Sequence, residues 1–314
     1  MTLKNPVIIS SSGLTNSAAK NAKLEAAGAG AIVLKSLFEE QIMMEADRLR
    51  NPSYYPEGSD YLAEYIRNHK LAEYLELIKE SKKICTIPVI ASINCYTDAE
   101  WVDFAKQIEE AGADALEINI LALQSDIQYK YGSFEQRHID ILSHIKKTIR
   151  IPVIMKLGSN FTNPVALIDQ LYANGAAAVV LFNRFYQPDI DVEKMEHTSG
   201  DVFSNASDLS TTLRWIGISS SLVSKIDYAA SGGIHKPDGI VKAILAGASA
   251  IEICSAIYQN TNLFVGEMNR FLSAWMERKG FKHISQFKGK LNAKDVEGIN
   301  MFERTQFLKY FSEK

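Results

Sequence analysis

Residues 231–257, SGGIHKPDGIVKAILAGASAIEICSAI, decide the fold. The segment begins at the end of an apolar run, turns through Gly232 and Gly233, and continues into a helical stretch. A second apolar run follows and ends at Cys254 and Ser255. This pattern predicts a strand, a glycine turn, a helix and a second strand, with the two strand ends side by side. Backbone N–H groups at such ends can bind a phosphate, although two tight turns without a ligand would have the same sequence.

The same unit recurs along the whole chain. Each copy combines a short apolar run, a segment of helical period, a Gly-Ala pair or a close variant, and a second apolar run. The apolar runs cover residues 6–10, 32–35, 88–92, 116–119, 152–156, 179–183, 227–231 and 251–254. Strands that are apolar at nearly every position are typical of parallel sheets buried on both faces. The alternation therefore predicts the α/β class, as a single (β/α)8 TIM barrel domain over residues 1–314.

Three segments are longer than a minimal barrel needs, namely residues 39–82, 121–150 and 187–222. Each follows the carboxyl end of a predicted strand, which is the face where barrel enzymes carry their sites. We therefore expect extended loops at the C-terminal face that form the walls and lid of a site. Apolar residues at helical spacing predict helices over residues 101–111 and 264–278.

Composition excludes several classes of protein. Of the 314 residues, 46% are hydrophobic and 23% are charged, as in an ordinary globular protein. The net charge of −3 gives no electrostatic basis for binding nucleic acid or an anionic membrane. The three cysteines, Cys85, Cys95 and Cys254, lack metal-ligand spacing, and so few cysteines favour a reducing compartment. With no signal peptide and no apolar run that could span a bilayer, we expect a cytoplasmic protein that acts on a small molecule without a metal.

The carboxyl ends of the predicted strands carry polar and small residues that would meet at one mouth of the barrel. They are Ser11, Ser12, Gly13, Lys35, Ser36, Asn119, Lys156, Asn183, Ser231, Gly232, Gly233, Cys254 and Ser255. A lysine at a buried strand end is unfavourable unless it meets an anion, so Lys35 and Lys156 indicate an anionic ligand or salt bridges to loop carboxylates. Asn119 and Asn183 suit the edge of a heterocycle, or alternatively cap loops. Two lysines beside a phosphate site favour a large phosphorylated cofactor, because a lysine beside a flavin can stabilise the negative charge of the reduced ring.

With these residues the chain resembles the class 1 dihydroorotate dehydrogenases, and it is similar to the FMN-binding domain of dihydropyrimidine dehydrogenases. The resemblance extends from Asn5 to Leu291. It implies a homodimer and an FMN at the C-terminal mouth of the barrel, with the phosphate on the Gly232–Gly233 turn and on the turn that holds Cys254 and Ser255. The positions that hold the flavin ring and ribityl chain match Ser11, Ser12, Lys35, Ser36, Asn119 and Lys156, and a further cofactor-binding pair matches Ser219 and Ser220. Lys35 and Lys156 are thereby the candidate catalytic residues.

The chemistry implied by the resemblance is the oxidation of dihydroorotate to orotate in pyrimidine biosynthesis. The family uses a cysteine base in the motif Asn-Leu-Ser-Cys-Pro-Asn, whereas residues 119–124 read NILALQ here. Ala122 stands at the cysteine position, and a methyl group cannot accept a proton. The family's substrate loop is also absent, since residues 51–56 read NPSYYP. Asn119, Gln124 and Asn183 remain as the candidate substrate-binding residues.

Four functions are consistent with this sequence. The first is dihydroorotate oxidation with a replacement base, either a hydroxyl such as that of Ser125 or a water molecule. The second is an FMN oxidoreductase that acts on a different substrate, and the third is a flavin-binding protein without catalytic activity. The fourth is a phosphosugar isomerase or aldolase barrel in which Lys156 forms a Schiff base.

Overall fold

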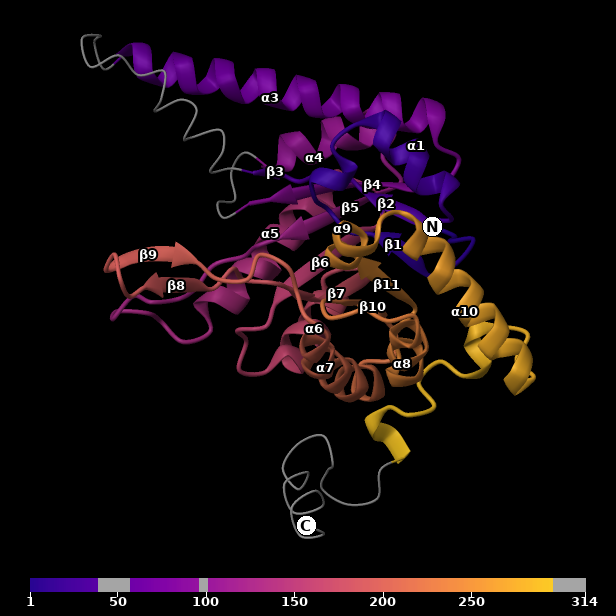
Figure 1. Cartoon of the computed structure of the whole chain (residues 1–314). Helices are drawn as coiled ribbons and strands as arrows, with labels where there is room; N and C mark the ends of the chain where they lie inside the picture. Colours follow the sequence, from indigo (N-terminus) through magenta and orange to yellow (C-terminus); the bar gives the residue numbers. More distant parts are fainter. Residues whose placement is uncertain (39–56, 96–100, 296–314) are drawn as a thin grey trace.

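The computed structural model describes residues 1–38, 57–95 and 101–295. Within these ranges, eight parallel strands form a closed barrel (Figure 1). They are β1 (Val7–Ile9), β2 (Ala31–Val33), β4 (Val89–Asn94), β5 (Ala115–Asn119), β6 (Val153–Gly158), β7 (Ala178–Asn183), β10 (Asp227–Ser231) and β11 (Ala250–Ile253). The ring closes because β1 pairs with both β2 and β11, and β2 pairs with β4. The predicted (β/α)8 barrel is confirmed.

The barrel interior begins with an apolar layer. It is built by Ile8, Ala31, Val33, Ile90, Ala115, Ile154, Val180, Ala229 and Ala250. Residues on the other side of the same strands, such as Val7, Leu116 and Met155, join the larger core shared with the helices. Both faces of each strand are therefore buried, which explains why the strands are apolar at nearly every position.

Helices surround the barrel on the outside (Figure 1). They are α1 (Ala18–Ala26), α3 (Glu57–Ile84), α4 (Trp101–Glu110), α5 (Ser133–Thr148), α6 (Pro164–Ala173), α7 (Leu209–Leu222), α8 (Asp238–Ala246), α9 (Ser255–Asn260) and α10 (Leu263–Lys279). The helices expected over residues 101–111 and 264–278 correspond to α4 and α10 and are confirmed. No helix of the described ranges is both long enough and apolar enough to cross a membrane.

The three long segments differ in structure. In the first, residues 39–56 lie outside the described residues, and residues 57–84 form the helix α3, so the expectation of an extended loop was wrong there. The short strand β3 (Leu37–Phe38) precedes this segment and pairs with β4. The second segment is irregular before α5. The third begins with the antiparallel hairpin of β8 (Pro188–Asp191) and β9 (Glu196–Ser199), which projects from the barrel in Figure 1.

Candidate functional site

One step above the apolar layer, the inward positions of the barrel become polar. Successive inward residues are two apart along a strand, so Ile8 is followed by Ser10, and Ile154 by Lys156. By the same period, Ala115 is followed by Glu117 and Ala250 by Glu252. All four polar side chains are at least nine-tenths buried. The barrel therefore carries a buried polar layer directly below its C-terminal mouth.

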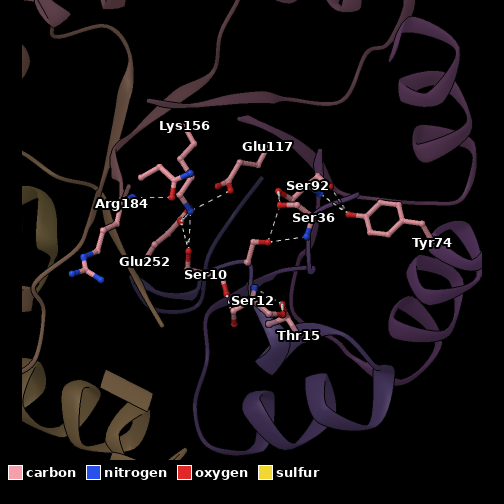
Figure 2. Close-up of polar contacts among 12 residues, drawn as sticks. Ser10, Ser12, Thr15, Ser36, Tyr74, Ser92, Glu117, Lys156, Arg184 and Glu252 are labelled. Carbon is pink, nitrogen blue, oxygen red and sulfur yellow. Dashed lines mark hydrogen bonds and ion pairs between the residues drawn. The ribbon is translucent and has the colours of Figure 1, made fainter. Parts of the chain in front are cut away.

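Lys156 is the centre of this layer (Figure 2). Its Nζ lies 2.7 Å from Glu252 Oε2, 3.3 Å from Glu117 Oε1 and 2.8 Å from Ser10 Oγ. Ser10 Oγ also donates a hydrogen bond of 3.0 Å to Glu252 Oε2. An ammonium group has three N–H donors, so these three acceptors satisfy the whole group inside the barrel. Lys156 therefore forms salt bridges, which were the predicted alternative to an anionic ligand. The carboxyl groups belong to the strands β5 and β11 and not to loops.

The pKa values of the two carboxyl groups in this cluster are shifted in opposite directions. Burial raises the pKa of Glu117 well above its usual range, and the neighbouring Glu252 raises it further. Burial also acts to raise the pKa of Glu252, but Lys156 and hydrogen bonds from its neighbours lower it overall. Burial acts to lower the pKa of Lys156, and the two carboxyl groups outweigh this effect and raise it. A Schiff-base lysine must lose its proton to attack a carbonyl, so this environment disfavours the aldolase interpretation.

Lys35 differs from Lys156 in burial. Its side chain is exposed, so the expectation that it is a buried lysine in need of an anion was wrong. The neighbouring Ser36 belongs to a chain of hydroxyl groups, with its Oγ 2.9 Å from Ser11 Oγ and 2.7 Å from Ser92 Oγ. Tyr74 of α3 holds the end of this chain, because its hydroxyl accepts a hydrogen bond from the Ser92 amide (Figure 2).

Ser12 and Gly13 follow β1 and begin a short 3-10 helix, Gly13–Thr15. The Ser12 side chain caps this helix by accepting a hydrogen bond of 3.2 Å from the amide of Leu14. A side chain at Gly13 would approach the hydroxyl of Tyr258 in α9 to 2.9 Å. The hydrogen bond from Leu14 holds the turn beside Ser11, and the close approach of Tyr258 leaves little room for a side chain at Gly13.

The Gly232–Gly233 turn at the end of β10 has two distinct glycines. Both have positive φ values, of 91° and 74°, which side chains disfavour. A Cβ at Gly233 would lie 2.1 Å from the backbone nitrogen of Leu209, so this glycine permits α7 to begin against the turn. A Cβ at Gly232 would meet no atom within 4 Å among the described residues. Gly232 therefore faces open space, as a phosphate-binding turn requires.

A segment of the third long loop lies against the same turn. The Ser204 amide donates a hydrogen bond of 3.1 Å to Ser255 Oγ, and Ser204 Oγ lies 2.9 Å from His235 Nε2. Arg184 secures the preceding residues by donating from Nη1 to the carbonyl oxygens of Asp201 and Val202. This segment therefore forms a wall beside the predicted phosphate site.

A cavity of about 140 Å³ joins the two parts of the predicted site. The candidate residues among those that line it are Ser11, Lys156, Asn183, Ser231, Gly232, Gly233, Cys254 and Ser255. A neighbouring cavity of about 380 Å³ shares Asn183, Ser231 and Gly232 with it. The Gly232–Gly233 turn, the end of β11 and the buried Lys156 therefore line the same cavity.

The candidate substrate residues after β5 lie close to this mouth. Asn119 is the last residue of the strand and is buried, and its Oδ1 has no hydrogen-bond partner among the described residues. The Nε2 atom of Gln124 is likewise buried and unpartnered within those residues. Ala122 is half-buried, and its carbonyl oxygen accepts a hydrogen bond of 3.0 Å from Asn160. Ser125, the candidate replacement base, is exposed.

Ser219 and Ser220 lie at the opposite end of the barrel. They belong to the last turns of α7, and Ser220 Oγ donates a hydrogen bond of 3.0 Å to the carbonyl oxygen of Ala246. Ala246 is the last residue of α8, which precedes the amino end of β11. The structure therefore does not bring this pair to the mouth. The expectation that Ser219 and Ser220 contact a cofactor at the mouth was wrong.

Glu117 and Glu252 were not among the residues predicted from the sequence. The signal was nevertheless present, because each glutamate interrupts an apolar strand, in Leu116-Glu117-Ile118 and in Ile251-Glu252-Ile253. A charged residue in a strand buried on both faces must find a partner inside the fold. Lys156, which ends the predicted strand over residues 152–156, is the partner of both.

The family model described as Dihydroorotate dehydrogenase matches residues 1–276 of the chain. The Dihydroorotate dehydrogenase B (NAD(+)), catalytic subunit, of Methanosarcina acetivorans is 26% identical over 294 residues, which cover 91% of this chain and 92% of that protein. The protein with the same description from Methanocella arvoryzae is 28% identical over 295 residues, covering 90% and 92%. A Putative dihydroorotate dehydrogenase A (fumarate) from Aeropyrum pernix is 28% identical over 252 residues, covering 76% and 79%.

Proposed function

Because the chain belongs to the dihydroorotate dehydrogenase family, we propose that it is an FMN-dependent oxidoreductase that acts on a CH–CH bond. The observation that carries this proposal is the cavity that connects the Gly232–Gly233 turn with Lys156. One end offers backbone at an open glycine for a phosphate, and the other offers a buried cation for a ring that gains negative charge. A cofactor with both groups at its two ends fits this arrangement.

Three features of the residues support FMN as that cofactor. Gly232 faces open space, so a phosphate can approach the backbone closely. Asn119 Oδ1 is a buried acceptor without a partner among the described residues, and a ring N–H is a suitable donor for it. The linked hydroxyl groups of Ser11 and Ser36 can bind the polar ribityl chain. We therefore assign the phosphate to Gly232, Gly233 and Ser255, and the ring to Asn119 and Lys156.

FMN supplies hydride chemistry when it is bound. Lys156 would lie beneath the ring with its ammonium group held in place by Ser10 and Glu252. The amides of Asn183 and Gln124 would bind the polar groups of a planar substrate. Ala122 cannot accept the substrate proton, so that proton must pass to a hydroxyl such as that of Ser125 or to water.

The substrate proposed first is dihydroorotate, which would be oxidised to orotate. Anaerobic mixing of the FMN-loaded protein with dihydroorotate tests it, and the expected result is loss of the absorbance of oxidised flavin. Purified protein that binds no FMN would overturn the cofactor assignment. Flavin that remains oxidised with dihydroorotate but is reduced by another donor would overturn the substrate assignment alone.

A second candidate is an FMN oxidoreductase for a different substrate. Ala122 favours it, because the base that the family uses for dihydroorotate is missing at this position. The same anaerobic experiment with a panel of reduced cyclic amides and enones, run in both directions, separates the two candidates. Flavin that exchanges electrons with no donor or acceptor would instead support a flavin-binding protein without activity.

A further inference from the structure

The polar layer around Lys156 contains one more acidic group than basic groups. Glu117 and Glu252 both approach the ammonium group, at 3.3 and 2.7 Å, and their side chains are each 1% exposed. Two carboxylates and one ammonium would leave a net negative charge in a buried, low-dielectric space, which is strongly unfavourable. Two neighbouring carboxyl groups avoid this state by holding one proton between them.

One oxygen atom of the pair indicates where the proton resides. Glu117 Oε2 is fully buried and has no hydrogen-bond donor among the described residues, whereas Glu252 Oε2 accepts from both Lys156 and Ser10. A buried oxygen without a donor is unfavourable as a carboxylate, but a protonated oxygen becomes a donor itself. The two carboxyl groups approach the same ammonium group, with Glu117 Oε1 at 3.3 Å and Glu252 Oε2 at 2.7 Å from Lys156 Nζ, so they lie on either side of one cation.

We propose that Glu117 and Glu252 share one proton at neutral pH, so that Lys156, Glu117 and Glu252 form an electrically neutral unit beneath the cofactor site. In the resting arrangement Glu117 carries the proton and Glu252 pairs with Lys156. If either glutamate is replaced by glutamine, the other can supply the single negative charge. The two glutamates are therefore positioning residues. Together they place a single negative charge beside the ammonium group of Lys156.

None of the other described groups around Glu117 and Glu252 supplies a second positive charge that could balance two carboxylates. They are Lys156 of β6, Ser10 after β1, Tyr74 of α3, whose pKa Glu117 helps to raise, and Cys254 after β11, whose pKa Glu252 helps to raise. Lys156 is the only one of these described neighbours that carries a positive charge. Burial raises the pKa of both Tyr74 and Cys254, which keeps these two groups neutral as well.

Infrared spectroscopy of the protein without added cofactor tests the shared proton directly. At pH 7 the wild-type protein should give the C=O stretch of a protonated carboxylic acid, shifted by exchange into D2O. The band should disappear in both E117Q and E252Q, because the remaining glutamate ionises beside Lys156. E267Q, at an exposed glutamate of α10, is the matched control and should retain the band. A wild-type spectrum without the band, or a band that persists in both variants, would overturn the proposal.

The consequence for the cofactor rests on the proposed function and is measured separately. Neither E117Q nor E252Q should change the preference of the protein for reduced over oxidised FMN by as much as tenfold, which is about 30 mV in the midpoint potential of a two-electron couple. A tenfold or larger change in E117Q would mean that both carboxyl groups are ionised in the wild type, and it would overturn the proposal. If no variant and no wild-type protein binds FMN, the proposed function fails while the infrared result still decides the shared proton.

Discussion

At the scale of single residues, the adjacent glycines of one turn have different tasks. Gly233 is required by the fold, because a Cβ there would overlap the backbone nitrogen of Leu209 at 2.1 Å. Gly232 is required by the fold only for its positive φ of 91°, since the space beside it is open. The open space beside Gly232 is where the proposed phosphate would lie.

This difference predicts losses of stability of different size for two alanine variants. Gly233→Ala should destabilise the protein by several kcal/mol, because the neighbouring backbone must move, whereas Gly232→Ala should lose only about 1–2 kcal/mol from its left-handed conformation. Urea unfolding measures both values. Gly232→Ala should also weaken the binding of FMN at least tenfold and that of riboflavin much less, because the methyl group enters the space assigned to the phosphate. Equal losses for FMN and riboflavin would contradict the placement of the phosphate.

Ala122 permits a second test at this scale. Ala122→Cys should create or increase dihydroorotate oxidation, because a thiolate can accept the proton that a methyl group cannot. Stopped-flow measurement of flavin reduction with dihydroorotate follows the gain. Ala122→Ser is the size-matched control and should give a smaller gain, since a hydroxyl group is a weaker base. A cysteine variant without any gain would mean that the pocket has been rebuilt for another substrate.

At the scale of elements, α5 depends on a buried histidine. His138 is fully buried, its Nδ1 lies 2.8 Å from the carbonyl oxygen of Phe134, and its ring meets the rings of Phe134 and Phe161 edge-on. Burial lowers the pKa of His138 from 6.5 to about 4. Protonation therefore occurs in the unfolded chain at a higher pH than in the folded protein.

The sign of the resulting pH dependence follows from this shift. Between pH 6.5 and 4 the unfolded state binds the extra proton, so the free energy of unfolding should fall as the pH is lowered, by roughly 3 kcal/mol from this residue. Urea unfolding at several pH values should show a flatter dependence for His138→Gln than for the wild type. An unchanged slope in His138→Gln would refute the assignment.

The sequence was a good guide to elements with a simple periodic pattern and a poor guide where two signals overlapped. In α4 the buried side chains are Trp101, Phe104, Ala105 and Ile108, which are spaced as in any amphipathic helix. In α3 the buried Leu71, Tyr74 and Ile78 have the same spacing, but the Pro- and Tyr-rich residues before the helix suggested one long loop. The helical spacing of the apolar residues would therefore have predicted α3 if it had been considered apart from the Pro- and Tyr-rich residues that precede the helix.

For the site, the outcome depended on how far each residue lies from a strand end. Residues directly after a strand, such as Gly232 and Ser255, could be placed because parallel strands end at one face. Ser219 could not, because it lies ten residues into α7, about 15 Å along the helix from Leu209 and toward the other end of the barrel. Sequence alone also could not distinguish the exposed Lys35 from the buried Lys156, since both end apolar runs.

At the scale of the whole molecule, the site joins elements that are distant in the sequence. Lys156 of β6 contacts Ser10 after β1 and Glu252 of β11, so the buried cluster connects the first and last strands of the barrel to its middle. The cavity above it is likewise lined by residues that follow β1 and by residues of β6, β7, β10 and β11. A ligand bound there should therefore stabilise the closed barrel and not merely one loop.

This coupling predicts that FMN raises the thermal stability of the entire chain. At a free concentration 100 times its Kd, a ligand that binds only the folded protein adds about 2.7 kcal/mol to the free energy of unfolding. For a chain of this size, each kcal/mol raises Tm by roughly 2–4 °C, so an increase of about 5–10 °C is expected. Scanning calorimetry with FMN, and with riboflavin at the same concentration, measures it. Because the phosphate is assigned to the turn after β10, riboflavin should give the smaller increase, and Gly232→Ala should abolish the difference between the two ligands. An FMN-dependent spectral change without any rise in Tm would mean that the ligand also binds the unfolded chain or lies outside the barrel mouth.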